Sequence, residues 1–135
     1  MSVRVTTKNL ASEILTELET YTESVSEAAD RAVGEVAKEA QKKLKATRSA
    51  QDSNIWRKYP LGWTIKSKKK KGHREEIVWN ARHYRLTHLL ENGHVIKNGT
   101  GRTYGRTRAF EHIAPVNKEA QEKLEQAIME AIEKG

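Results

Sequence analysis

A long helical stripe of apolar residues constrains this chain more than any other feature of its sequence. Between Leu10 and Leu44, apolar residues recur every three or four positions, which is the spacing of one face of an α-helix. The stripe consists of Leu10, Ile14, Leu18, Tyr21, Val25, Ala28, Ala32, Val36, Ala40 and Leu44. Lys42 and Lys45 favour a helix end there, because the helix dipole places negative charge at its C-terminus. The sequence therefore predicts a helix over residues 8–46.

This predicted helix is too long for a compact fold of the same mass. At 1.5 Å per residue it would extend about 58 Å. A globule formed by 135 residues is only about 37 Å across. Residues 20–26, Thr-Tyr-Thr-Glu-Ser-Val-Ser, have modest helix propensity. Two arrangements follow: the helix breaks near residues 20–26, or it projects and packs on another subunit.

Composition and charge both point to a partner surface. Leu, Ile, Val and Phe make up only about a fifth of the chain, near the composition at which chains cannot bury enough apolar surface to fold. We therefore expect a thin core that a partner completes. Net charge is −4 over residues 1–39, +14 over residues 40–108 and −3 over residues 109–135. A basic middle between acidic ends predicts a polyanion, an acidic protein or another copy of this chain as partner.

The middle of the chain predicts a small antiparallel sheet. Trp63 and Ile65 alternate with polar residues, and a second β-rich run follows a turn at Gly72. We predict a β-hairpin over residues 61–81 with a basic tip, and an irregular segment over residues 53–60. The three tryptophans are expected to anchor the core and not to stack on nucleic acid bases: Trp56, Trp63 and Trp79.

The C-terminal half returns to helical spacing. A short helix is predicted over residues 83–92, and it ends at a glycine, as helices commonly do. Residues 97–108 are glycine-rich and basic, which is typical of a loop, and residues 116–133 form an amphipathic helix. We predict a single domain of residues 1–135 with an α+β fold: a long N-terminal helix, a small antiparallel sheet with a β-hairpin, a short middle helix and a C-terminal amphipathic helix. One core is expected to contain Tyr84, Leu89, Leu90, Phe110, Ile113, Leu124 and Ile128.

Motifs for catalysis or metal binding are not found in the sequence. The chain has no cysteine, which excludes disulfides, thiolate metal sites and cysteine nucleophiles. His83 and His88 are five residues apart, whereas paired zinc ligands on a helix are four apart. No apolar run is long enough to span a membrane, and the N-terminus lacks a secretory pattern. We expect a soluble cytoplasmic protein that is not an enzyme and has no metal and no cofactor.

Two groups of basic residues are candidate interaction sites. The first is the hairpin tip, with Lys68, Lys69, Lys70, Lys71 and Arg74. The second is the basic loop, with Arg102, Arg106 and Arg108. Adjacent lysines repel one another, so we expect the tip to lie in solvent or against an anion.

The C-terminal half contains two motifs that resemble a known family. The first is Tyr84-Arg-Leu-Thr-His-Leu-Leu-Glu-Asn-Gly-His94, a short helix that ends in Glu-x-Gly. The second is Phe110-Glu-His-Ile-Ala-Pro115, which precedes an acidic amphipathic helix. These motifs resemble the small neck or tail-completion (head–tail joining) proteins of long-tailed bacteriophages. The resemblance covers residues 78–135 well and the first half in general layout, and Ala109 stands where many members have proline. The matching residues are Tyr84, Leu90, Glu91, Gly93, His94, Phe110, His112, Ile113 and Pro115.

The resemblance implies a structural virion protein. It implies an α+β subunit, made in the host bacterial cytoplasm, that forms a ring completing the tail or joining it to the capsid portal complex. By analogy with the family, the ring is a hexamer that contacts neighbouring neck and tail proteins, and it contacts packaged DNA non-specifically.

Two other functions remain open at this point. A nucleic-acid-binding protein would use the basic central segment, although the sequence has no helix-turn-helix, zinc-finger or RNA-binding signature. A toxin-like ribonuclease would use His83, His88, His94 and His112 with nearby arginines, but the sequence places no base next to a nucleophile.

Overall fold

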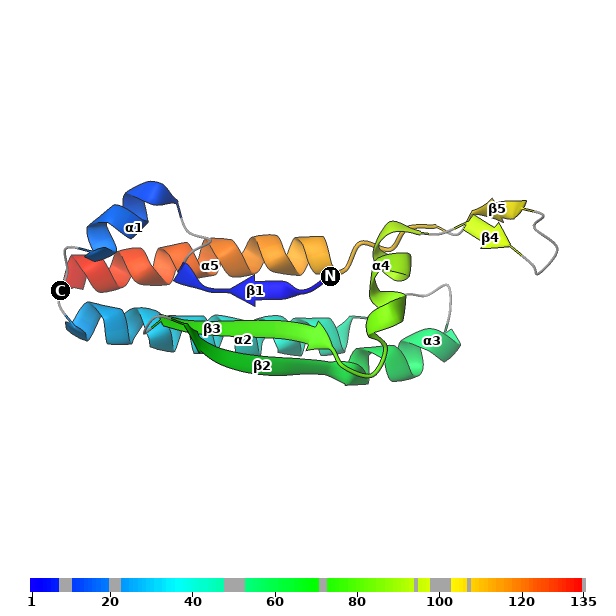
Figure 1. The fold of residues 1–135 in the computed structure, drawn as a ribbon, viewed down its shortest axis with the longest axis horizontal. Coiled ribbons are helices and arrows are strands. Elements are labelled where there is room, and N and C mark those ends of the chain that lie inside the picture. Colours follow the sequence, from blue (N-terminus) through cyan, green and yellow to red (C-terminus); the bar gives the residue numbers. More distant parts are fainter. Residues whose placement is uncertain are drawn as a thin grey trace.

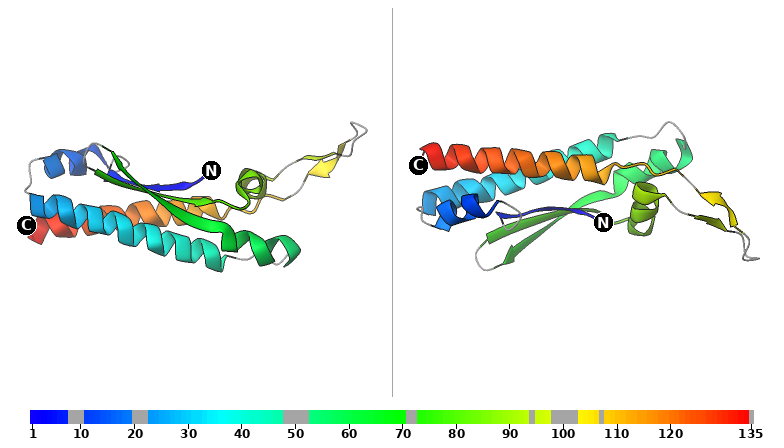
Figure 2. Two further views of the ribbon diagram at one scale, coloured as in Figure 1. Left: turned by 60° about the horizontal axis from the view of Figure 1, so that its bottom comes forward. Right: turned by 90° about the horizontal axis from the view of Figure 1, so that it is seen from above.

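Two long helices and a small sheet form the body of the molecule. The computed structural model describes residues 1–7, 11–19, 23–47, 53–70, 73–93, 95–97, 103–106 and 108–134. Helices α2 (Glu23–Ala46) and α5 (Ile113–Lys134) run antiparallel, and both cover the same face of a three-stranded sheet (Figures 1 and 2). The expected α+β fold is therefore confirmed.

The prediction of one continuous helix over residues 8–46 is wrong, because the structure has two helices in this region. The structure has a short helix α1 (Ser12–Glu19) and the 24-residue helix α2, and residues 20–22 between them lie outside the described parts. At 1.5 Å per residue α2 is about 36 Å long, which matches the size of the body. Of the two arrangements we considered, the structure has the break. Helix α1 lies beside the C-terminal half of α5, and its Ile14 packs against the core.

The three-stranded sheet consists of the predicted hairpin and a short N-terminal strand. Strands β2 (Trp63–Lys70) and β3 (His73–Asn80) pair antiparallel, and β1 (Val3–Val5) pairs with the other side of β3. The sequence analysis missed β1, which is only three residues long, although the alternation Val-Arg-Val is typical of a half-buried strand. The hairpin is confirmed, but its strands extend further than expected, because Lys69 and Lys70 belong to β2 and not to the turn, and β3 begins at His73.

The core has an aliphatic part and an aromatic end. The aliphatic part lies between α2, α5 and the sheet, and it includes Val33, Leu44, Val78, Leu124 and Ile128, each fully buried. The aromatic end consists of Trp56, Tyr59 and Trp63, which are also buried. The segment expected to be irregular is in fact helix α3 (Ser53–Lys58) followed by the 3-10 helix η2 (Tyr59–Gly62).

Helix α4 (Tyr84–Asn92) packs differently from the prediction. Its buried residues are the polar Thr87 and Glu91, while Tyr84 is 54% exposed. The expectation that Tyr84 belongs to the core was therefore wrong. Leu90 is partly buried against the core. Helix α4 faces the polar hydroxyl of Tyr59 and the start of α5, so polar side chains occupy its inner face.

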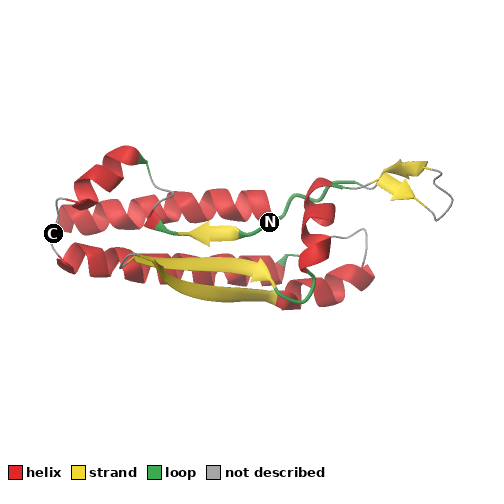
Figure 3. Ribbon diagram, viewed as in Figure 1, coloured by secondary structure: helices red, strands yellow, loops and turns green. Residues whose placement is uncertain are grey.

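The segment expected to be a loop contains a second hairpin. Strands β4 (Val95–Lys97) and β5 (Thr103–Arg106) pair antiparallel and project away from the body (Figure 3). We call this hairpin the arm. Helix α5 begins at Ile113, three residues earlier than predicted, with Pro115 in its first turn. Proline is tolerated there because the first turn of a helix needs no backbone N–H donors.

Candidate functional site

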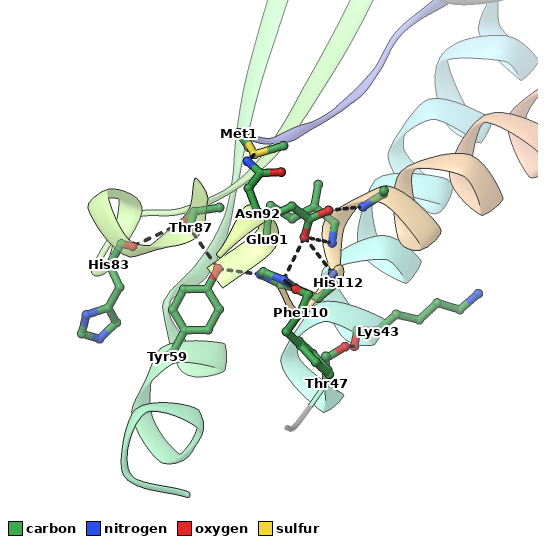
Figure 4. Close-up of polar contacts among 12 residues, drawn as sticks. Met1, Lys43, Thr47, Tyr59, His83, Thr87, Glu91, Asn92, Phe110 and His112 are labelled. Atoms are coloured by element: carbon green, nitrogen blue, oxygen red, sulfur yellow. Dashed lines mark hydrogen bonds and ion pairs between the residues drawn. The ribbon is translucent and has the colours of Figure 1, made fainter. Parts of the chain in front are cut away.

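The junction of α4 with α5 contains a buried carboxylate that caps a helix. Glu91, at the end of α4, is 2% exposed. Its Oε1 accepts hydrogen bonds from the backbone N–H groups of His112 (2.7 Å) and Ile113 (2.9 Å), and its Oε2 accepts one from Ala114 (2.9 Å). The first N–H groups of a helix have no partner within the helix, and a negative charge there is stabilised by the helix dipole. Glu91 therefore holds the start of α5 against the end of α4 (Figure 4).

A buried histidine extends this contact to η2. The Nδ1 atom of His112 lies 2.9 Å from Glu91 Oε1 and 2.9 Å from the carbonyl oxygen of Phe110. Both neighbours are acceptors, so Nδ1 carries a proton. On the other side of the ring, Nε2 lies 2.8 Å from the hydroxyl of Tyr59, which in turn lies 3.4 Å from Thr87 Oγ1. Burial raises the pKa of Tyr59 to about 12.

Aromatic rings enclose this chain of hydrogen bonds. Trp56 meets Tyr59, Phe110 and His112 edge to face, with centroid distances of 4.8–5.3 Å. Such pairs contribute about 0.5–1.5 kcal/mol each beyond the area that they bury. The His112 side chain is completely buried, and its two ring nitrogens already have partners within the protein. This arrangement fits a structural role, because no substrate atom can reach the imidazole.

The same junction fixes the root of the arm. The N–H of Phe110 donates to the carbonyl of Leu90 at 2.8 Å, which brings together the two chain segments that enter and leave the arm. Gly93 has φ of 72°, a left-handed value that favours glycine. Arg106 on β5 donates to the carbonyl of Asn92 at 3.1 Å. The family motifs therefore position the arm relative to α5.

The predicted basic residues do not form one site. Lys68 and Lys69 are exposed on β2, near the start of α2, whereas exposed Arg106 and Arg108 lie at the other end of the molecule. Lys71, His94 and Arg102 lie outside the described residues, as does the side chain of Lys70.

Arg74 contacts residues of its own subunit, on β3 and on α2. Its Nε donates to Glu76 Oε1 at 2.6 Å, and its Nη1 lies 3.4 Å from the carbonyl of Asp30 on α2. The guanidinium rests on Gly34, where any Cβ would come within 2.7 Å of Nη1. Glu76 itself is 1% exposed, so Arg74, whose side chain is 37% exposed, balances a buried charge.

Four charged residues bind α2 to α5 at the surface. Glu39 and Lys43 on α2 form ion pairs with Lys123 and Glu119 on α5. Lys43 also lies 3.6 Å from Glu39, and Lys123 lies 3.2 Å from Glu119. Hydrogen bonds with the lysines lower the pKa of both glutamates, in Glu39 mainly through Lys123 and in Glu119 mainly through Lys43.

Sequence reasoning missed several residues of the junction. Tyr59 lies outside the motifs that carried the family resemblance, and Thr87 lies within the first motif but is not among its matching residues. Nothing in the sequence indicates that Tyr59 contacts Thr87 and His112. The Pro60 that follows Tyr59 was the available signal, because proline near the start of a 3-10 turn fixes the local backbone.

The described residues show no site for a metal and no membrane span. Within the described ranges, no three acidic or histidine side chains come together in a way that would hold a metal ion. Among the helices that the structure describes, none combines the length and the apolar character that a membrane span requires.

Comparison with known proteins identifies the family. No curated protein and no solved structure matches this chain. Residues 12–93, more than half of the chain, match the HK97-gp10-like family model, described as "Bacteriophage HK97-gp10, putative tail-component". The match includes α1, α2 and the hairpin, which we expected to resemble the family only in layout, and it ends at Gly93, before the second motif. The chain thus belongs to the HK97-gp10-like family of phage tail components.

Proposed function

We propose that this protein is a non-enzymatic subunit of the phage neck. In this proposal, copies of the chain form a ring, by family analogy a hexamer, that completes the tail or joins it to the portal complex. The protein is made in the host cytoplasm and becomes part of the virion. The observation that carries the proposal is the family match over residues 12–93.

The structure supports an assembly role in two ways. The arm projects from the body, and a two-stranded hairpin is marginally stable alone in water, so a partner surface is expected to support it. The buried polar groups of Glu91 and His112 position the root of this arm. Buried hydrogen bonds at the junction of α4 with α5 therefore hold the arm in a position where a partner can contact it.

Electron microscopy of phage particles tests the proposal. Particles made without this gene should accumulate as filled capsids beside unattached tails, and supplying the gene in trans should restore joining. Antibody labelling of complete particles should place the protein at the neck. Normal virions without the gene would refute the neck role.

The alternative, a nucleic-acid-binding protein, has less support. Its basic residues lie at opposite ends of the molecule, and Arg74 neutralises a buried glutamate. Four tip lysines alone would give a salt slope near −3.6 on duplex DNA, from about 0.9 per neutralised phosphate. A slope at least that steep, with virions unaffected by loss of the gene, would favour this alternative.

A further inference from the structure

The three-stranded sheet has one face that no described helix covers. Helices α2 and α5 pack on the inner face, and α1, α3 and α4 lie near the ends of the sheet (Figure 2). Side chains alternate between the two faces along a strand, so the pairing register assigns each residue to a face. The inner face carries the core residues Val3, Ile65 and Val78. The opposite face, which we call the outer face, carries the residues that alternate with them.

Two large apolar residues lie at the centre of the outer face. Ile77 and Trp79 stand on either side of Val78 on β3, and both are partly buried without belonging to the core. Trp79, which we expected to anchor the core, therefore lies on the other side of the sheet from it. The solvated face of an antiparallel sheet is usually polar. An isoleucine beside a tryptophan on such a face favours contact with another apolar surface.

Cations flank this apolar pair. The pairing register places Ile77 between Arg4 on β1 and Lys66 on β2, and it places Glu75 beside Lys68. Glu75 is the one acidic residue that the structure describes on this face, and its carboxylate lies 3.5 Å from the Arg4 guanidinium. Lys66 and Lys68 are exposed, and neither forms an ion pair with another described residue. A partner that covers the apolar pair would therefore meet a row of lysines along one side.

The size of the outer face fits a single helix. Three strands at a spacing of about 4.8 Å are about 10 Å wide, which is the diameter of one α-helix. Lys66 and Lys68 are two residues apart on a strand, or about 6.8 Å. Carboxylates four residues apart on a helix are about 6 Å apart, so a helix along β3 can present one to each lysine. Nucleic acid fits less well, because Glu75 repels phosphates and an isoleucine side chain offers no flat surface for base stacking.

We propose that the outer face binds an amphipathic, acidic helix of another protein. The apolar stripe of that helix covers Ile77 and Trp79, and carboxylates on its flank pair with Lys66 and Lys68. Both faces of the sheet are then packed against helices. The source of the helix, a neighbouring protein of the neck, rests on the proposed function, whereas the contact itself is testable on the purified chain.

A synthetic helical peptide tests the contact. The probe has leucines along one stripe and glutamates on its flanks, and fluorescence anisotropy measures its binding. Lys66→Glu/Lys68→Glu should weaken binding about tenfold, because attraction becomes repulsion. The same peptide with serine in place of leucine should bind about tenfold more weakly, because the apolar contact is lost. Trp56 and Trp63 are buried, so a blue shift of tryptophan emission on binding should come from Trp79 and be absent in Trp79→Phe.

Lys38→Glu/Lys42→Glu is the matched control. Each reversal changes the net charge by two, so from the wild-type +7 both double variants carry +3. Lys38 and Lys42 are exposed on α2, which packs on the inner face of the sheet. A helix layer separates them from the probe, and charges are screened over about 8 Å at physiological salt, so the control should bind the peptide within about twofold of the wild type. Circular dichroism confirms that each variant is folded before binding is measured.

Three results would overturn the proposal. Absent binding of the peptide, or equal binding to the two double variants, would show that the outer face is not a site for an acidic helix. Tighter binding of single-stranded DNA than of the peptide, lost in Lys66→Glu/Lys68→Glu, would assign the face to nucleic acid. Self-association of the wild-type chain that the same variant abolishes would assign it to a second copy. Normal virions without the gene would refute the neck role and leave the peptide result to stand on its own.

Discussion

Removing the Glu91 carboxylate should be among the most damaging single changes in this protein. The carboxylate accepts three backbone hydrogen bonds at 2.7–2.9 Å and is 2% exposed. An N-cap contributes about 0.5–2 kcal/mol, a charge at a partly buried helix end up to about 2 kcal/mol, and each buried donor left unpaired costs about 1–3 kcal/mol. These contributions overlap, so we expect Glu91→Ala to lower the free energy of unfolding by about 3–5 kcal/mol.

Urea denaturation followed by circular dichroism measures this loss. A domain of this size has a slope of about 2 kcal/mol per molar urea, so the midpoint should fall by about 2 M. Glu91→Gln keeps one acceptor oxygen but loses the charge, and it should cost about 1–2 kcal/mol. Hydrogen exchange should speed up first at the amides of His112, Ile113 and Ala114.

Glu111→Ala is the matched control. Glu111 precedes the same helix but is exposed, so its removal should change stability by no more than about 0.5 kcal/mol. If Glu91→Ala also cost less than about 1 kcal/mol, the carboxylate would not be the group that holds α5, and the account of the junction would be wrong.

Three further predictions concern the core, the hairpin and the junction tyrosine. Leu124→Ala should cost about 2–5 kcal/mol in urea unfolding, because Leu124 is fully buried between α5, α2 and the sheet. Replacing the lysines at positions 68–71 by serine should leave the melting temperature nearly unchanged yet reduce joining of heads to tails, and wild-type phage titres would contradict an interaction role. The raised pKa of Tyr59, about 12 against an ordinary value of 10, stabilises the fold fully below pH 10, and this contribution should be lost as the pH rises towards 12. Alkaline unfolding of Tyr59→Phe should lack that dependence.

The sequence was sufficient for the elements whose pattern is local. The hairpin strands follow from the alternation around Trp63 and Ile65, and α5 from the spacing of Ala120, Leu124 and Ile128, because burial of one face imposes these periods. The length argument indicated that residues 8–46 would break or project, but it could not choose between these outcomes. Tertiary packing decided between them, because α2 packs against both the sheet and α5 and is about as long as these two elements.

Features that depend on contacts distant in sequence could not be predicted. Glu91 and His112 belong to two separate sequence motifs. The sequence does not indicate that Glu91 caps α5, the helix that begins directly after His112. Tyr84 was expected in the core because it is aromatic and at helical spacing, yet α4 turns its polar Thr87 and Glu91 inward. Arg74 was assigned to the hairpin tip by proximity, whereas its partner Asp30 is 44 residues away.

The lysines of β2 also affect how the free subunit behaves before assembly. Strand β2 is an edge of the sheet, and its outer backbone groups offer a template for pairing with a second β2. In such a pair the exposed side chains of Lys66, Lys68 and Lys69 would meet their own counterparts, and like charges placed opposite one another are destabilising. The same charges therefore discourage open-ended aggregation of the free subunit through this edge of the sheet, because each added strand would place lysine opposite lysine.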